Sequence, residues 1–198
     1  MVRSSDAKER LINSILELVA ERSYTNVGVQ EICEYASAKK GSFYYFFKSK
    51  QELMMEALNH HELTINELIL KPAFASGFTI GECTERMFDL TYKYQKSLKE
   101  NTGRVNGCFF GNLALELSTQ DELIRHRIDK IFLAQTKLIK FGLEEANINT
   151  PRDDIDFQQT SKAILAYWEG VILMAKVQND PGIISTLGKN VSTLIAYH

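Results

Sequence analysis

Residues 39–50 read KKGSFYYFFKSK and place five consecutive aromatic side chains between lysines. If this segment is helical, each residue turns by about 100°, so Phe43 and Phe47 share one face and can pack inward. Tyr44 and Tyr45 then point away from that face. A tyrosine beside lysines on an exposed helix can donate its hydroxyl proton to a phosphate oxygen or lay its ring along a groove. The stretch is therefore expected to be half core and half contact surface for nucleic acid.

Positive charge is concentrated on the same short segment. The 198 residues have a formal net charge of −2, but residues 1–50 carry eight Lys or Arg and six Asp or Glu, a balance of +2. Four of these eight cations stand at positions 39, 40, 48 and 50. Such clustering favours an anionic partner at this segment.

Capping patterns predict a helix on each side of the aromatic segment. Asp6 and Glu9 have the spacing of a capping box ahead of an apolar stripe. Ser49 and Glu52 have the same spacing and predict a helix with Lys50 in its first turn. A phosphate at that helix end would offset the unfavourable interaction between the lysine and the helix dipole.

Two short helices are expected between these capped ones. The stretch VQEICEYA after Gly28 has an apolar face with helical spacing, and a break at Ser37 and Ala38 separates it from a helix over residues 39–47. Two helices of this length joined by so tight a turn are typical of the helix-turn-helix motif.

The stretch ASAKKGSFYYFFKSKQEL resembles the N-terminal DNA-binding domain of the TetR (tetracycline-repressor-like) family of bacterial transcription regulators. The usual pattern of that family is approximately AGVSKGTLYHHFPSKEEL, and the resemblance covers residues 10–57. The positions that match the pattern are Lys40, Gly41, Tyr44, Phe47, Ser49, Lys50 and Leu53. The resemblance implies base-edge or groove contacts from Lys40, Gly41, Ser42 and Tyr44, and phosphate contacts from Tyr45 and Lys50.

Four positions depart from the family pattern. Gly28 stands where a Ser or Thr usually caps the second helix, so only backbone amides can reach a phosphate there. Ser37 replaces the usual turn glycine, at a cost on the order of 1 kcal/mol if its φ is positive. Lys39 replaces the usual serine cap of the third helix. Phe46 replaces a polar residue, and it either packs inward or meets an apolar surface such as a thymine methyl group.

The chain as a whole is expected to be all-helical, with about nine helices, because it has only three prolines and no long alternating β-branched pattern. We expect a three-helix helix-turn-helix DNA-binding domain over residues 1–50 and a larger effector-binding and dimerisation domain over residues 51–198. No Gly/Ser linker separates them, so the fourth helix is expected to continue from one into the other. Further helix starts are predicted at Thr79 with Glu82, Thr119 with Glu122, Thr150 with Pro151 and Asp153, and Asp180 with Pro181.

Two late apolar stripes are candidates for a subunit interface. They consist of Ile164, Leu165, Trp168, Val171, Ile172 and Ala175, and of Ile183, Ile184, Leu187, Val191, Leu194 and Ile195. The resemblance implies a homodimer that pairs the last two helices of each subunit, and a protein that reads two successive major grooves needs a two-fold axis. The alternative is that these stripes face the core of their own subunit.

A pocket for a small-molecule effector is expected among the later helices. Its candidate residues combine apolar bulk with a few uncharged polar groups, which suits a mostly apolar ligand: Phe88, Tyr92, Cys108, Phe109, Asn112 and Trp168. For each of them, plain core packing is the alternative. The segment NGCFFGNLALELS, which holds three of them, also resembles a stretch of the effector domain in one subgroup of the family.

No enzyme, cofactor or metal site is expected. The pairs Glu56 with His60 and Glu122 with His126 are each one helical turn apart, but two ligands do not make a metal site. No apolar run reaches the roughly 18 to 20 residues that span a bilayer, and the N-terminus lacks a signal-peptide pattern. A cytoplasmic protein without a membrane partner is therefore expected.

Two other functions remain open from the sequence. The protein could be a dimeric DNA-binding protein without small-molecule control. It could also be a redox-sensing regulator that uses Cys108, provided that this thiol is exposed beside cations. The cysteines Cys33, Cys83 and Cys108 are far apart and lack CxxC spacing, so a disulfide framework is not expected.

Overall fold

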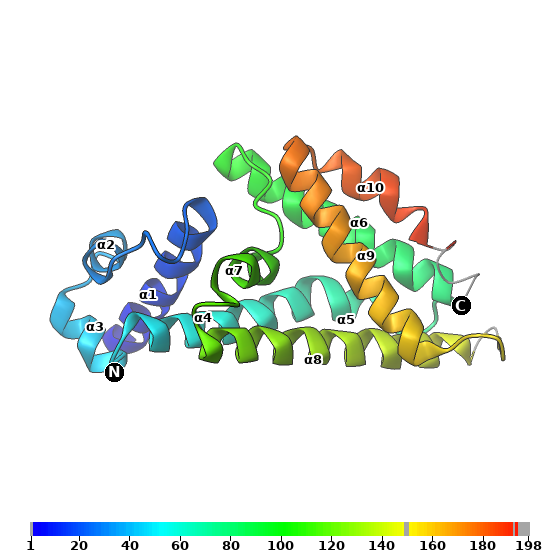
Figure 1. The fold of residues 1–198 in the computed structure, drawn as a ribbon, viewed down its shortest axis with the longest axis horizontal. Helices are drawn as coiled ribbons and strands as arrows, with labels where there is room; N and C mark the ends of the chain where they lie inside the picture. The colour runs from blue at the N-terminus through cyan, green and yellow to red at the C-terminus, as the bar shows by residue number, and fades with distance from the viewer. Residues whose placement is uncertain (1, 149–150, 192, 194–198) are drawn as a thin grey trace. The chain divides into compact units, whose positions relative to one another are not determined.

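The computed structural model describes residues 2–148, 151–191 and 193, and these contain helices but no strand (Figure 1). The elements are α1 (Val2–Glu21), α2 (Val29–Tyr35), α3 (Lys40–Phe46), α4 (Lys50–Ile65), the π-helical turn η1 (Asn66–Leu70), α5 (Lys71–Ala73), α6 (Ile80–Thr102), α7 (Phe109–Leu117), α8 (Glu122–Asn147), α9 (Phe157–Gln178) and α10 (Gly182–Gly188). Because α4, η1 and α5 follow one another without a break, the described chain forms nine helical rods, which confirms the all-helical prediction. None of these helices is long and apolar enough to cross a bilayer.

The helices gather into two compact units. Unit 1 contains Met1–Leu63 and Asn112–Ile128, and unit 2 contains Thr64–Gly111 and Asp129–His198. The helices α4, α7 and α8 each begin in one unit and end in the other.

Unit 1 is built on an apolar core shared by α1, α2, α3 and α4. Leu11 and Ile15 of α1 and Ile32 of α2 are fully buried, as are Phe43 of α3 and Leu53 of α4. Each of these residues belongs to the apolar stripe of its helix, so burial of the stripes fixes how the short helices α2 and α3 pack.

The turn between α2 and α3 is strained, as the sequence suggested. Ser37 has a φ of 49°, in the left-handed region that residues other than glycine rarely adopt. The amide of Ala38 donates to the carbonyl of Cys33 at 2.8 Å, which closes the end of α2. Lys39 is the N-cap of α3 and makes no side-chain capping hydrogen bond.

One predicted capping box is complete, and a second is present in its Ser49 half. Thr79 and Glu82 form the complete reciprocal box at the start of α6. At the start of α4, the hydroxyl of Ser49 accepts from the amide of Glu52 at 3.1 Å, while the carboxylate of Glu52 accepts from the amide of Lys48 at 2.7 Å. These helices therefore begin where the sequence indicated.

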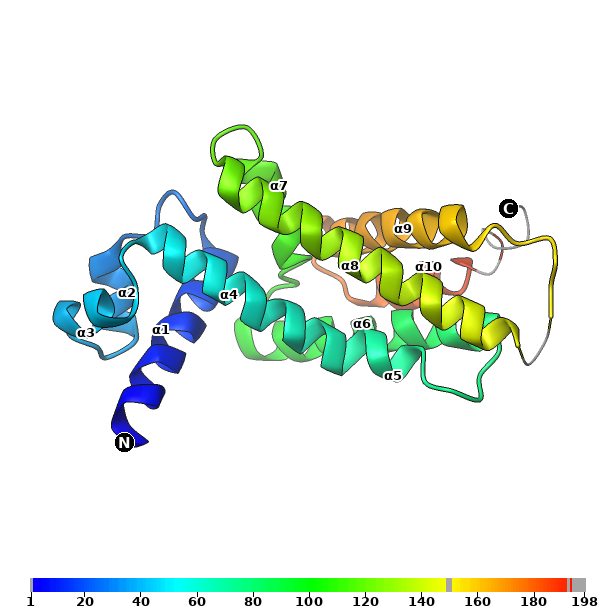
Figure 2. The same ribbon diagram turned by 90° about the horizontal axis from the view of Figure 1, so that it is seen from below.

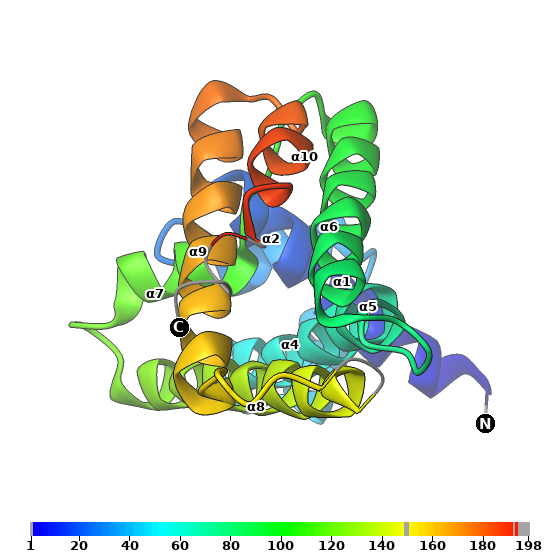
Figure 3. The same cartoon turned by 90° about the vertical axis from the view of Figure 1, so that its right-hand side faces the viewer.

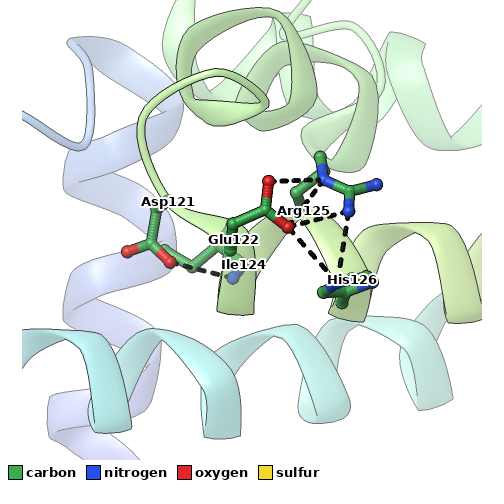
Figure 4. Close-up of polar contacts among 5 residues, drawn as sticks. All are labelled: Asp121, Glu122, Ile124, Arg125 and His126. Carbon is green, nitrogen blue, oxygen red and sulfur yellow. Dashed lines mark hydrogen bonds and ion pairs between the residues drawn. The ribbon is translucent and has the colours of Figure 1, made fainter.

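Three predicted helix starts are wrong. Asp6 lies inside α1 and forms an ion pair with Arg10, because α1 already begins at Val2. The cap of α8 is Asp121, whose carboxylate accepts from the amide of Ile124 at 3.0 Å, rather than Thr119 (Figure 4).

At the third position, α9 begins at Phe157 with Asp156 as its cap, because the carboxylate of Asp156 accepts from the amides of Gln158 and Gln159. The predicted start at Pro151 and Asp153 therefore falls before the helix, and Thr150 lies outside the described residues. An aspartate directly before the helix offers a stronger cap than a residue several positions upstream.

In unit 2, α10 packs against both α6 and α9 (Figure 3). A Cβ atom added at Gly188 of α10 would lie 2.5 Å from the Cβ of Phe88, so only glycine permits this approach. Trp168 of α9 donates its indole N–H to the hydroxyl of Thr91 on α6 at 2.9 Å. Gln95 of α6 bonds both the carbonyl and the amide of Gly107, at 2.9 Å and 3.3 Å.

The expected interface stripes face the core of their own subunit for the most part. The residues buried within the subunit are Ile164, Trp168, Val171, Ile172, Ala175, Ile184 and Val191. Leu165, Ile183 and Leu187 are half-buried, and Leu194 and Ile195 lie outside the described residues. The opposite face of α9 leaves Leu173, Met174 and Val177 exposed. Any association surface on α9 therefore lies on this second face.

Candidate DNA-binding surface and effector-binding unit

The aromatic segment divides as its spacing predicted. Phe43 and Phe47 are buried, with their ring centroids 6.0 Å apart, whereas Tyr44 and Tyr45 are 59% and 79% exposed. The ring of Tyr44 lies edge-on to the ring of Phe43, with centroids 5.2 Å apart. The buried Phe43 ring therefore helps to hold the orientation of the exposed Tyr44 ring. Helix α3 thus presents two tyrosine hydroxyls to solvent on a rigid support.

Unpaired cations surround these tyrosines. Lys39, Lys40 and Lys48 are exposed, and the ion pairs among the described residues include none of them. By contrast, other cations of unit 1 are paired: Lys8 with Glu56, Arg10 with Asp6, Arg22 with Glu31, Arg125 with Glu122, and Arg127 with Glu62. Among the described side chains of unit 1, the unneutralised positive charge therefore gathers around α3, which suits a phosphate backbone.

Lys50 is turned largely toward the protein. Its ammonium group donates to the carbonyls of Tyr24 and Val27, at 2.9 Å each, and lies 4.1 Å from the centre of the Tyr24 ring. Burial lowers its pKa. Two of its three N–H groups are thus used to hold the loop between α1 and α2, and one is left for the phosphate contact that the resemblance implies.

Glu116 of α7 holds the same loop and was not predicted. Its carboxylate accepts from the amide of Tyr24 at 2.9 Å and from the amide and hydroxyl of Thr25 at 2.8 Å each. These hydrogen bonds lower its pKa against the opposing effect of burial. Its position 91 residues from Thr25 in sequence leaves no local signal by which sequence reasoning could find it.

The remaining candidate residues lie at the starts of α2 and α3 and on the outer face of α3. Gly28 is the exposed N-cap of α2, with φ −93° and ψ 155°, and offers no side chain. Gly41 is exposed and Ser42 is half-buried in the first turn of α3. Backbone amides at these two helix starts are the groups that can approach a phosphate closely.

Phe46 is half-buried at the end of α3. Its ring lies edge-on to Tyr45 with centroids 4.9 Å apart, and 6.3 Å from the centroid of Phe47. It therefore packs on its neighbours while part of it stays accessible. This accessible part can meet an apolar group such as a thymine methyl.

We expect Phe46→Ala to weaken DNA binding unevenly across operator variants. Binding should fall most for duplexes with thymine near the contacted position, because the phenyl ring can discriminate a methyl group but makes no phosphate hydrogen bond. Fluorescence anisotropy titrations on duplexes that differ in one thymine-to-uracil exchange measure this directly. An equal loss on all duplexes would contradict the methyl contact, and Phe46→Leu serves as the apolar control.

The candidate effector residues fall into two groups. Phe88, Phe109 and Trp168 are buried, and Tyr92, Cys108 and Asn112 are half-buried. Phe88 packs against Tyr167, with centroids 5.7 Å apart. The hydrogen bond from Trp168 to Thr91 joins α9 to α6, the helix that carries Phe88 and Tyr92. Asn112 is the first residue of the second segment of unit 1, whereas the other five belong to unit 2.

Cys108 interacts with the carboxyl group of Glu169, and both residues are half-buried. Burial and the charge of Glu169 raise the pKa of the Cys108 thiol well above its ordinary value, and the thiol donates a hydrogen bond to that carboxyl group. Burial in turn raises the pKa of Glu169 to about 7. Cys108 is therefore a protonated thiol at neutral pH, a form that reacts slowly with oxidants. Lys176 is also near enough to interact electrostatically with Cys108.

Glu169 should make stability depend on pH. Its pKa of about 7 in the folded protein exceeds the ordinary glutamate value, so the folded state holds the proton more tightly and loses stability as pH rises from about 5 to 8. We expect Glu169→Gln, which mimics the protonated form, to remove this loss. Thermal unfolding at pH 5 and pH 8 measures it, with exposed Glu145→Gln as control, and identical pH dependence in all three proteins would contradict it.

The glutamates of the two Glu/His pairs contact cationic side chains. Glu122 pairs with both Arg125 and His126 on the surface, in the network drawn in Figure 4. Glu56 is bound by Lys8. Among the described residues, no group of three or more His, Cys, Asp or Glu side chains is placed to hold a metal ion.

Comparison with known proteins agrees with this arrangement. Residues 11–57 match the family model described as "Bacterial regulatory proteins, tetR family", and residues 83–188 match the model "Tetracyclin repressor-like, C-terminal domain". The relatives include the transcriptional regulator AcuR of Cereibacter sphaeroides, 28% identical over 90% of this chain and 80% of that protein. They also include the repressor NemR of Escherichia coli, 26% identical over 96% of this chain and 94% of that protein.

Solved structures show the same fold. A regulatory protein TetR from Rhodobacter sphaeroides superposes with a TM-score of 0.81 at 25% identity, over 95% of this chain and 98% of that one. A TetR transcriptional regulator from Chloroflexus aurantiacus superposes with a TM-score of 0.83 at 20% identity, over 99% and 97% of the two chains. Together with the two family models, which cover both the helix-turn-helix segment and more than half of the chain, these matches show that the chain belongs to the TetR family of DNA-binding transcription regulators, which are not enzymes.

Proposed function

We propose that the protein is a homodimeric repressor that leaves a palindromic operator when a small, mostly apolar molecule binds in its C-terminal part. Residues 1–50 bind DNA, and residues 51–198 bind the effector and form the dimer. The observation that carries this proposal is the outer face of α3, where exposed tyrosines stand among unpaired lysines over a buried aromatic base. Some relatives are themselves named repressors, which supports repression rather than activation.

The DNA contacts are assigned by position. Lys40, Gly41, Ser42 and Tyr44 enter the major groove, while Tyr45 and the remaining N–H of Lys50 contact phosphates. Gly28 and Lys39 contribute backbone amides, and Lys39 also adds charge. Exposure of this set, apart from the half-buried Ser42 and the largely inward Lys50, supports the assignment.

The dimer forms through the exposed face of α9 together with α10. Leu173, Met174 and Val177 are 48%, 47% and 74% exposed on one side of α9. Gly170, on the same side, has open space around its Cβ position, so another helix can approach closely there. A second copy of the chain buries these side chains and supplies the two-fold axis that a palindromic operator requires.

The switch is a linkage between two binding events. The effector binds more tightly to a subunit arrangement in which the two α3 helices no longer fit successive major grooves, so it lowers operator affinity. A coupling free energy of about 1 to 3 kcal/mol is typical of such switches. Phe88, Tyr92, Cys108, Phe109, Asn112 and Trp168 remain the proposed effector contacts.

Selection of bound duplexes from a random pool tests this function. We expect a palindrome with half-sites about one helical turn apart, and binding that weakens steeply with salt. Repeating the binding with a panel of small molecules separates an effector-controlled repressor from a dimeric DNA-binding protein without control. A non-palindromic consensus would contradict the dimer, and indifference to double-stranded DNA at low salt would contradict the whole proposal.

A further inference from the structure

Unit 2 contains buried polar groups that its own fold leaves unsatisfied. In the described part of the chain, the buried side-chain atoms without a hydrogen-bond partner are Asn66 Oδ1, Arg86 Nε, Gln135 Oε1 and Thr160 Oγ1. All four residues belong to unit 2. A buried polar atom without a partner is costly, so its presence calls for an explanation such as a bound molecule.

Gln135 is the clearest of the four because a matched residue exists in the same unit. Gln135 on α8 is 1% exposed and Gln95 on α6 is 2% exposed. Gln95 uses both ends of its amide to bond Gly107. The oxygen of Gln135 bonds nothing. The fold thus accounts for Gln95 but not for Gln135.

Asn66 belongs to the helical rod that runs alongside α8, the helix of Gln135. In Figures 1 and 2 the rod η1–α5 and the later part of α8 run alongside each other in the same direction, and a Cβ atom at Gly142 of α8 would lie 2.5 Å from Phe74, at the end of α5. Gln135 precedes Gly142 by seven residues, roughly two helical turns, and so lies on the same face of α8.

The π-helical turn brings Asn66 to the matching level. Asn66 precedes Phe74 by eight residues, and because a π turn holds about one residue more than an α turn, this also amounts to roughly two turns. By this count both residues lie roughly two turns before the contact of Gly142 with Phe74, on neighbouring rods. Single π turns of this kind are frequent at functional sites.

We propose that Asn66 and Gln135 form the polar end of the effector site and bind a hydrogen-bond donor of the ligand. Two acceptor oxygens on facing helices suit an uncharged group with two N–H bonds, such as a primary amide or a urea, at one end of an otherwise apolar molecule. This inference rests on the proposed function, which it narrows by assigning a class to the effector. Without the ligand, neither oxygen contributes a hydrogen bond to the stability of the folded protein.

Benzamide and methyl benzoate test this donor requirement, because they have similar size and only benzamide has N–H bonds. By calorimetry or ligand-observed NMR, we expect the wild-type protein to bind benzamide about tenfold more tightly or better. We expect Gln135→Met and, independently, Asn66→Leu to remove this preference. No benzamide binding, equal binding of the two probes by the wild type, or an unchanged preference in both variants would overturn the assignment.

Thermal unfolding supplies a readout that does not depend on the ligand. Gln135→Met should leave the melting temperature unchanged or raise it, because methionine fills the same volume without an unsatisfied oxygen. The matched Gln95→Met should lower it by about 5 °C or more, since both partners on Gly107 lose their bonds. An equal drop in the two variants would overturn the inference that Gln135 lacks a partner.

Operator binding in the same preparations keeps this inference separate from the proposed function. If benzamide binds through Gln135 but leaves the operator complex unchanged, the ligand site stands while the proposed switch fails. If operator binding is intact and the wild type does not prefer benzamide, the site assignment fails while DNA binding stands.

Discussion

Phe43→Ala should unfold the DNA-binding unit under conditions where Tyr44→Ala only weakens DNA binding. Phe43 is fully buried, so its truncation should cost about 3 to 5 kcal/mol of unfolding free energy. Tyr44 is 59% exposed, and its truncation removes mainly the edge contact with Phe43, so stability should change by about 1 kcal/mol or less. If Tyr44 reads a base edge, its loss should cost about 1 to 3 kcal/mol of binding, roughly 5-fold to 150-fold in affinity.

Chemical denaturation and anisotropy titration separate the two effects in neighbouring residues. Tyr44→Phe is the matched control, because it keeps the ring and removes only the hydroxyl. Recovery of affinity in Tyr44→Phe would assign the contact to the ring rather than to a hydrogen bond. A Tyr44→Ala protein that binds the operator as well as wild type would contradict the placement of α3 in the groove.

The sequence was sufficient to divide the α3 side chains into buried and exposed ones, because their helical spacing is local. Helical spacing separates Phe43 and Phe47 from Tyr44 and Tyr45, and the flanking residues fix the ends of the helix. The possible strain at Ser37 was suggested by the resemblance, which has glycine at this turn, and its φ of 49° meets that condition.

Residues whose partners are distant in sequence could not be assigned in this way. Lys50 was expected to face phosphate, but the carbonyls that take up two of its N–H groups belong to a loop more than twenty residues earlier. The roles of Glu116 and Glu169 depend on helices that pack only in the folded chain. Periodicity also identified the apolar stripe of α9 but could not tell its core face from its exposed one, because both carry aliphatic residues.

Charged substitutions on the exposed face of α9 should separate the proposed dimer. We expect the double substitution of Leu173 and Val177 by Glu to make the protein monomeric, because the two exposed apolar side chains would become like charges facing each other across a two-fold axis. Each subunit alone should fold normally, since neither side chain belongs to the core. Size-exclusion chromatography with light scattering measures the mass directly.

Loss of the dimer should reduce operator affinity far more than loss of any single base contact. A monomer engages one half-site, whereas a dimer gains the second half-site as an intramolecular event, an advantage of roughly 100-fold to 10,000-fold. The matched control is Leu63→Glu, an exposed leucine of α4 with the same change of charge per site. If the double variant stays dimeric, α9 does not form the dimer interface. The same conclusion follows if the ratio of its affinities for a palindrome and for a single half-site equals the ratio of the wild type. A palindromic site is expected because each subunit of the dimer places one α3 helix in one of two successive grooves. A monomer that binds the operator with normal affinity would contradict this expectation.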